Sequence, residues 1–217
     1  MKPEDFRPVF TVPEVRSQRV RAGELDVHLP EGDGPSPAVV FVHGPVAAGG
    51  VRPAEWPVYL GYCALAASRG VAAATADLDY VDMARAGEAV PQLEREIESV
   101  RSLPQIDGER IALWAFSGGG LLVDRWLADA PDWLRCVALS YPLLQPPPTV
   151  VTVPIVLTRV GRERPEIQET VDRFLAGELP LERIEVPNGR HAFDFFDDTD
   201  ESRAAVERAL DLVVGRL

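Results

Sequence analysis

Short apolar runs and helical patterns alternate along most of this chain, and this alternation limits the fold more than any other feature. The run 38–42 (AVVFV) is typical of a strand that is buried on both faces. Further strand-like runs occur at 71–76, 111–115, 135–141, 154–160 and 182–187, separated by helical patterns at 56–69, 89–103, 119–129, 165–176 and 200–216. The alternation predicts an α/β fold with a mostly parallel central sheet and helices on both faces.

The segment before this alternation has a different pattern. Residues 1–17 are rich in proline and predict an arm on the surface, whereas 18–29 alternate as one or two antiparallel strands. We therefore expect 1–35 to form an arm and antiparallel edge strands, and 36–217 to form the core of a single domain. The Pro-rich stretch 142–150 is expected to be a connection, so no large cap domain is predicted.

Composition argues against several classes of partner. Apolar residues make up 46% of the 217 residues, and 34 acidic against 22 basic side chains give a net charge of −12. No basic run interrupts this charge, so neither nucleic acid nor an anionic membrane is an expected partner. The N-terminus lacks the apolar run of a signal peptide, and no stretch approaches the roughly 18 apolar residues of a membrane helix. We expect a cytoplasmic protein with a small-molecule substrate; its oligomeric state, a homodimer included, is left open.

The two cysteines do not indicate a metal or redox site. Cys63 and Cys136 lie in apolar contexts without ligand spacing, so they are expected to be reduced thiols of the core. No cluster of histidine, cysteine and aspartate has the spacing of metal ligands. We therefore expect neither a metal nor an organic cofactor.

The sequence AFSGGG lies between the strand expected at 111–115 and the helix expected at 119–129. A small residue, serine and glycine in this pattern between a strand and a helix are typical of a nucleophile elbow. The turn tolerates little bulk two residues before and after the serine, and Ala115 and Gly119 meet that demand. We predict that Ser117 is a nucleophile; the alternatives are a helix N-cap and a phosphate cradle.

A serine nucleophile needs a general base, and the chain contains three histidines: His28, His43 and His191. His28 lies before the core, and His43 ends the first buried strand, where a histidine more often braces a loop. His191 follows the last strand across a turn (VPNGRHAF) and comes after the serine in chain order. We predict that His191 is the base; the alternative is a surface histidine.

The acid that orients the base is expected in the loop after the strand 154–160. Glu163 is the first candidate in this loop, and Glu166 is the second. Arg162 and Arg164 flank Glu163, so a plain surface ion pair is the alternative.

Two backbone N–H groups are expected to hold the oxyanion. The Gly118 N–H, at the start of a helix, supplies the first. The second would come from the loop after the first buried strand, where Pro45 has no N–H and Val46 takes its place. Substrate contacts are expected from nearby aromatic residues: Trp56, Tyr59, Phe116 and Phe193.

From about residue 36 to its C-terminus, the chain resembles the dienelactone hydrolase-like branch of the α/β-hydrolase superfamily. The segments that carry the resemblance are VVFVHG, WPVYLGY, IALWAFSGGG, PIVLTRVGRERPEI and GRHAFDFFDD. Relatives usually carry aspartate where Glu163 stands, and often a second glycine where Gly44 runs directly into Pro45. Enol-lactone specialists of the branch use cysteine in place of Ser117. The resemblance implies an α/β-hydrolase fold and hydrolysis of esters, lactones or thioesters.

The expected function is hydrolysis of a small ester, lactone or thioester through an acyl-serine intermediate. The same serine and histidine would also serve a cyclase, dehydratase or acyl transferase of secondary metabolism. A third hypothesis is a non-catalytic ligand-binding protein on a hydrolase scaffold, which an incomplete oxyanion loop would favour.

Overall fold

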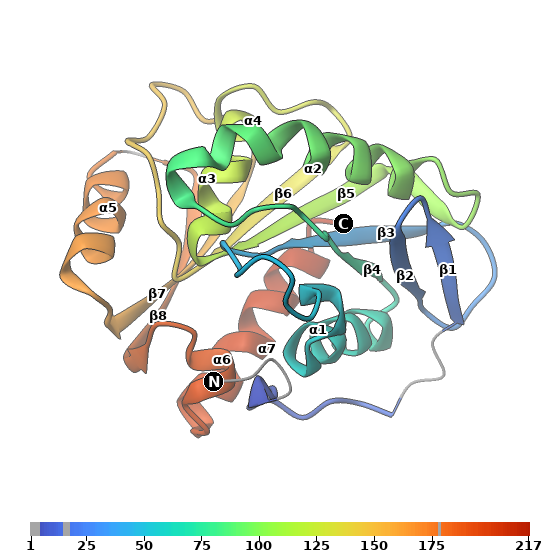
Figure 1. Cartoon of the computed structure of the whole chain (residues 1–217), viewed down its shortest axis with the longest axis horizontal. Coiled ribbons are helices and arrows are strands. Elements are labelled where there is room, and N and C mark those ends of the chain that lie inside the picture. Colours follow the sequence, from blue (N-terminus) through green and yellow to red (C-terminus); the bar gives the residue numbers. More distant parts are fainter. Residues whose placement is uncertain (1–4, 15–17, 178) are drawn as a thin grey trace.

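One mixed sheet organises the chain in the computed structural model, which describes residues 5–14, 18–177 and 179–217. Within these residues eight strands form the sheet in the order β1-β2-β4-β3-β5-β6-β7-β8 (Figure 1). The strands are β1 Gln18–Ala22, β2 Leu25–Leu29, β3 Ser36–Val42, β4 Ala72–Thr75, β5 Ile106–Phe116, β6 Leu134–Ser140, β7 Ile155–Arg162 and β8 Leu181–Arg190. Parallel pairing joins the strands from β4 through β3, β5, β6 and β7 to β8. At the other edge, β2 pairs antiparallel with β4, and β1 pairs antiparallel with β2. The expected α/β architecture and antiparallel edge strands are confirmed.

Helices cover both faces of the sheet (Figure 1). The longer ones are α1 Pro57–Ser68, α2 Ala86–Arg101, α5 Pro165–Leu175 and α7 Asp200–Val214. Strand side chains alternate between the faces, so Val40 packs with α2 and α5 in one core while Val39 packs with α1 and α7 in the other. Because the central strands are buried on both faces, they appear as continuous apolar runs in the sequence.

The helix expected at 119–129 is broken. A 3-10 turn, η4 Ser117–Gly119, leads into α3 Gly120–Val123, and α4 Arg125–Ala128 follows. The Leu127 N–H donates to the Asp124 C=O, three residues back, so a tighter turn replaces the regular helical bond at this point.

Several short elements were not expected from the sequence. They are the 3-10 turns η2 Pro53–Glu55 and η3 Met83–Arg85 and the helix α6 Phe193–Phe196. The connection 142–150 contains no helix or strand, as expected. Among the described residues, no helix combines the length and apolar character needed to cross a membrane.

The described part of the N-terminal arm lies on the surface and also packs one side chain into the core. Residues 1–4 and 15–17 lie outside the described residues. In the remaining part, Phe10 is 4% exposed and its ring lies 4.8 Å from that of Tyr62 on α1. The arm is fixed to α1 and α6 by backbone bonds, since the Val58 N–H donates to the Phe6 C=O at 2.8 Å and the Val9 N–H to the Asp194 C=O at 2.9 Å.

Candidate active site

Ser117 lies at the turn where β5 ends and η4 begins. Its backbone has a φ of 54°, in the left-handed region that residues with a Cβ atom seldom adopt. Close packing keeps the turn in place, because a Cβ on Gly119 would lie 2.4 Å from the Val42 carbonyl oxygen. This contact explains why the turn requires a residue without a side chain two positions after the serine, as expected from the sequence.

Ser117, His191 and Glu163 form a continuous chain of hydrogen bonds. The Ser117 Oγ lies 2.8 Å from the His191 Nε2, and the His191 Nδ1 lies 2.5 Å from the Glu163 Oε2. The three residues follow the carboxyl ends of β5, β8 and β7, the sheet edge where ligands bind in open α/β folds. A carboxylate on Nδ1 holds that proton and leaves Nε2 free to accept the serine proton.

The geometry distinguishes the two candidate acids. The Glu163 side chain is 3% exposed, and its Oε1 accepts a hydrogen bond of 2.8 Å from the Arg164 N–H. Arg164 also lies 3.7 Å from this oxygen through its Nε, but its own side chain is 57% exposed. Glu166 is exposed in the first turn of α5. The buried carboxylate that contacts His191 is therefore Glu163. Its ion pair with the exposed Arg164 is longer than its contact with His191.

Three described non-glycine residues have a left-handed backbone, and all three lie in this region. Besides Ser117 they are Tyr141, with a φ of 40°, and Ala192, with a φ of 61°. Tyr141 follows β6 and places its ring edge-on to the His191 ring, with 5.0 Å between centroids. Ala192 directly follows His191. Backbone strain of this kind persists where the surrounding structure over-determines the conformation, and it concentrates at functional sites.

A buried carboxylate behind His191 was missed in the sequence. Asp194 is 1% exposed and accepts hydrogen bonds from the hydroxyl groups of Tyr141, at 2.8 Å, and Tyr62, at 2.9 Å. Burial raises the pKa of Asp194 to about 6, although both hydroxyl groups oppose the shift. The only sequence signal was an acidic residue three positions after His191, which does not reveal burial.

The oxyanion loop differs from expectation at Val46. Its N–H donates to the Tyr80 C=O at 2.8 Å, so it is not a free donor, and the predicted second half of the oxyanion hole is wrong in this structure. The loop turns back toward Tyr80 and leaves Pro45, which has no N–H, beside Gly118. The Gly118 N–H is in the first turn of η4, where backbone donors have no helical acceptor. Of the two predicted donors, Gly118 alone keeps the expected position.

The other two histidines are part of the framework. The His43 Nδ1 donates to the Gly44 C=O at 2.6 Å, and its Nε2 accepts from the Leu78 N–H at 3.2 Å, so this ring braces the loop. Burial lowers the pKa of both His43 and His28. Both rings are therefore neutral at pH 7, and neither hydrogen-bonds to Ser117.

A cavity of about 380 Å³ opens onto Ser117 and His191. Trp56, Tyr59 and Phe116, from which substrate contacts are expected, line it. Phe193 does not, because it is 2% exposed and packs in the core, where its ring lies 5.8 Å from that of Tyr141. Further aromatic walls come from segments that the sequence did not single out: Phe6, Tyr141, Phe195 and Phe196.

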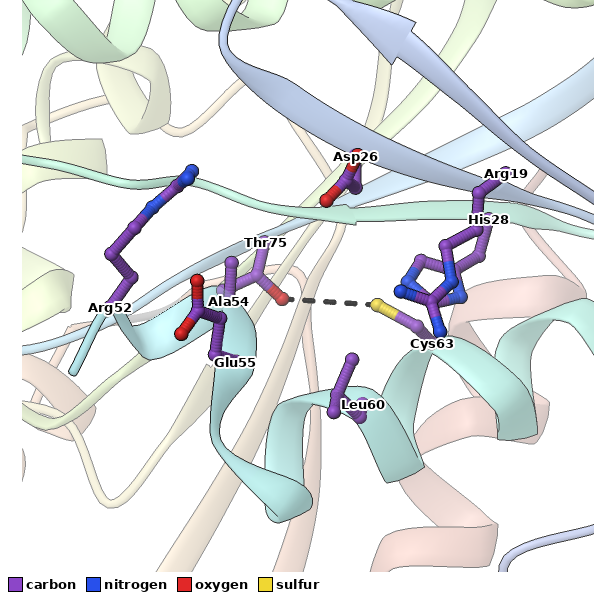
Figure 2. Close-up of a pocket in the computed structure, with 9 residues that line it drawn as sticks. All are labelled: Arg19, Asp26, His28, Arg52, Ala54, Glu55, Leu60, Cys63 and Thr75. Atoms are coloured by element: carbon purple, nitrogen blue, oxygen red, sulfur yellow. Dashed lines mark hydrogen bonds between the residues drawn. The ribbon is translucent and has the colours of Figure 1, made fainter. Parts of the chain in front are cut away.

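A second, smaller cavity of about 100 Å³ lies between the edge strands, β4 and α1 (Figure 2). It is lined by Cys63, Thr75 and His28 together with charged residues, and it contains no member of the hydrogen-bonded chain. The Cys63 Sγ lies 3.8 Å from the Thr75 Oγ1, and burial raises the pKa of this thiol to about 12. Cys63 is therefore protonated at pH 7 and is no nucleophile. Both cysteines are free and buried, as expected.

No group of three or more histidine, cysteine, aspartate or glutamate side chains among the described residues is placed to hold a metal ion.

Comparison with solved structures identifies the fold. A dienelactone hydrolase-like promiscuous phosphotriesterase from metagenomic libraries matches with a TM-score of 0.66 and 17% identity, over 93% of this chain and 97% of that one. The chain has the α/β-hydrolase fold. Esterase 2 of Thermogutta terrifontis, in a structure phosphoramylated by tabun, matches with a TM-score of 0.64 and 18% identity over 92% and 93% of the two chains. A variant of the esterase rPPE matches with a TM-score of 0.70 and 14% identity over 95% and 84%.

No protein-family model matches the sequence, and no curated protein matches it at a significant level.

Proposed function

We propose that this chain is a serine hydrolase that cleaves a small ester, lactone or thioester through an acyl-serine intermediate. The observation that carries the proposal is the hydrogen-bonded chain from Ser117 through His191 to the buried Glu163, at the mouth of an aromatic cavity. A nucleophile, its base and an orienting acid within hydrogen-bond reach are the geometric signature of nucleophilic catalysis.

In the first half-reaction, the Ser117 Oγ attacks the substrate carbonyl carbon while the His191 Nε2 takes the hydroxyl proton. Glu163 keeps the Nδ1 proton in place and balances the charge of the imidazolium. The Gly118 N–H donates to the oxyanion of the tetrahedral intermediate. When the intermediate collapses, the bond to the alkoxide or thiolate breaks, and His191 protonates this leaving group.

In the second half-reaction, His191 takes a proton from water as the water oxygen attacks the acyl-serine. Collapse of this second intermediate breaks the bond to the Ser117 Oγ, which recovers its proton from His191. The products are the free acid and the regenerated serine, and the two steps consume one water molecule. The cavity walls are mainly apolar, which strengthens the electrostatic interactions inside it.

The solved structures of similar fold support hydrolysis of an ester-type bond. Those cited above are described as esterases or as a phosphotriesterase. The Thermogutta terrifontis esterase also has a structure described as phosphorylated by paraoxon. An organophosphorus reagent is therefore a suitable probe for the nucleophile of this chain.

The test is covalent labelling with an activated fluorophosphonate, read as the intact mass of the wild type, Ser117→Ala and His191→Ala. We expect one adduct on the wild type and none on either variant, because the reagent needs both the hydroxyl and the base. The absence of an adduct on the folded wild type would overturn the hydrolase mechanism.

One observation favours a second candidate, a ligand-binding protein without turnover. The Val46 N–H is engaged by Tyr80, and Pro45 has no donor, so the oxyanion site lacks one of its two expected N–H groups. This alternative predicts that a ligand raises the melting temperature while Ser117 stays unlabelled. Labelling of Ser117 excludes it.

A further inference from the structure

The N-terminal arm contributes a wall to the candidate active site. Phe6 lines the same cavity as Ser117 and His191, although it lies more than a hundred positions before either of them. Its side chain is half-buried, in contrast to the buried Phe10. Phe6 therefore presents part of its ring to the cavity.

Four rings from three separate segments meet at this wall. The Phe6 ring lies 4.7 Å from that of Trp56, which precedes α1, and 4.9 Å from that of Phe195 on α6. The Phe196 ring lies 6.3 Å from Phe6 and 4.5 Å from Phe195. These separations are those of favourable aromatic pairs. We name these four residues the aromatic wall.

We propose that the aromatic wall is a subsite for an uncharged aromatic group of the substrate, and that Phe6 determines this specificity. The inference rests on the proposed function, because it names the substrate class of the same site. Among the described residues, the cavity lining includes no acidic side chain and one arginine, Arg164, whose side chain is largely exposed. A ring on the acyl or the alcohol part of an ester would be covered by Phe6, Trp56 and Phe195 while its carbonyl lies at Ser117.

The arm does not depend on the Phe6 side chain for its position. Its backbone is held by the bonds between Phe6 and Val58 and between Val9 and Asp194. It also packs closely on α1, since a Cβ on Gly61 would lie 3.0 Å from Pro8. Removal of the Phe6 ring should therefore change the cavity more than the fold.

The first experiment compares the hydrolysis of ethyl acetate, ethyl phenylacetate and benzyl acetate in a pH-stat. For Phe6→Ala we expect kcat/KM on the preferred aromatic ester to fall about tenfold more than on ethyl acetate, because the ring contact is lost for the aromatic group only. For Phe6→Leu, which keeps apolar volume, kcat/KM on the aromatic ester should lie between the values for the wild type and for Phe6→Ala. Val12→Ala is the matched control, since this arm side chain is 43% exposed and does not line the cavity.

The second experiment measures binding without turnover. Calorimetry gives the Kd of phenylacetamide, an unreactive amide, for Ser117→Ala and for Ser117→Ala with Phe6→Ala. We expect the Kd to rise about tenfold when the Phe6 ring is removed.

The two experiments separate the subsite from the reaction. If the wild type hydrolyses no ester but phenylacetamide binding depends on Phe6, the hydrolase proposal fails and the subsite stands. If esters are hydrolysed, but the three rates fall equally in Phe6→Ala or do not change, the subsite is refuted. Binding of phenylacetamide that is absent, or that does not depend on Phe6, also refutes it.

Discussion

Replacement of Ser117 by glycine should stabilise the fold relative to replacement by alanine. Both variants lose the Oγ and its bond to the His191 Nε2, so they differ only in the Cβ atom. At a φ of 54°, the Cβ costs about 1–2 kcal/mol in the left-handed conformation. Glycine loses more backbone entropy on folding, about 0.5–1 kcal/mol relative to alanine, which offsets part of this gain.

The net difference is about 1 kcal/mol in favour of Ser117→Gly, or roughly 2–4 °C in Tm for a chain of this size. Urea unfolding at pH 7 measures it, with calorimetry as a second readout. Ala115→Gly is the control, because Ala115 lies in β5 and is buried, so glycine should destabilise the fold there. A Ser117→Gly variant no more stable than Ser117→Ala would refute the idea that the turn at Ser117 is strained.

Two further predictions concern the carboxylates around His191. Glu163→Gln should lower kcat/KM by about 10³-fold or more with little change in stability, because the amide no longer fixes the imidazole tautomer; steady-state kinetics on the preferred ester test this. For Asp194, the folded-state pKa of about 6 lies above the ordinary value of 3.8, so the folded protein binds a proton between roughly pH 4 and 6 that the unfolded chain does not. The stability contributed by Asp194 therefore falls as the pH rises through this window, and Asp194→Asn should remove that dependence in urea unfolding from pH 4 to 7. Burial also raises the pKa of Glu96, to about 7, so Glu96 makes stability fall with pH in the same direction, but equally in the wild type and in Asp194→Asn. The measured quantity is therefore the difference in unfolding free energy between the wild type and Asp194→Asn. A difference that stays constant from pH 4 to 7 would contradict the prediction.

Local sequence patterns predicted the features that depend on local chemistry. Side chains along β3 alternate between the two faces of the sheet, so Val39 and Val40 pack in opposite cores, and a strand buried on both faces appears in the sequence as an apolar run. The serine turn was predictable because its small neighbours are required by the turn itself. Chain order and the loop after a strand were sufficient to favour His191 as the base and to reduce the candidate acids to Glu163 and Glu166, since parallel strands place their following loops at one edge.

Features that depend on distant contacts were not predictable in this way. The direction of the Val46 N–H depends on how its loop meets Tyr80, more than thirty positions later. Phe6 becomes a cavity wall only because the arm docks on α1 and α6, and Phe193 turns into the core while Phe195 faces the cavity. Phe193, Phe195 and Phe196 all follow His191 closely in the sequence, and the pattern of residue types does not assign each ring to core or cavity.

Pro45 offers a direct test of how far the oxyanion site limits the rate. In proline the Cδ atom stands where another residue carries its N–H hydrogen, and the Pro45 Cδ lies 2.8 Å from the position a Cβ on Gly118 would take. An N–H at position 45 would therefore point toward Gly118, where the oxyanion is expected. One oxyanion donor is worth about 10²–10³ in kcat, so Pro45→Ala should raise kcat on the preferred ester by at least tenfold. Pro147→Ala, in the connection 142–150, is the control for a general effect of losing a proline. A Pro45→Ala variant that is folded, binds phenylacetamide as the wild type does and shows no gain in kcat would mean that a second donor at this position is not what limits the reaction.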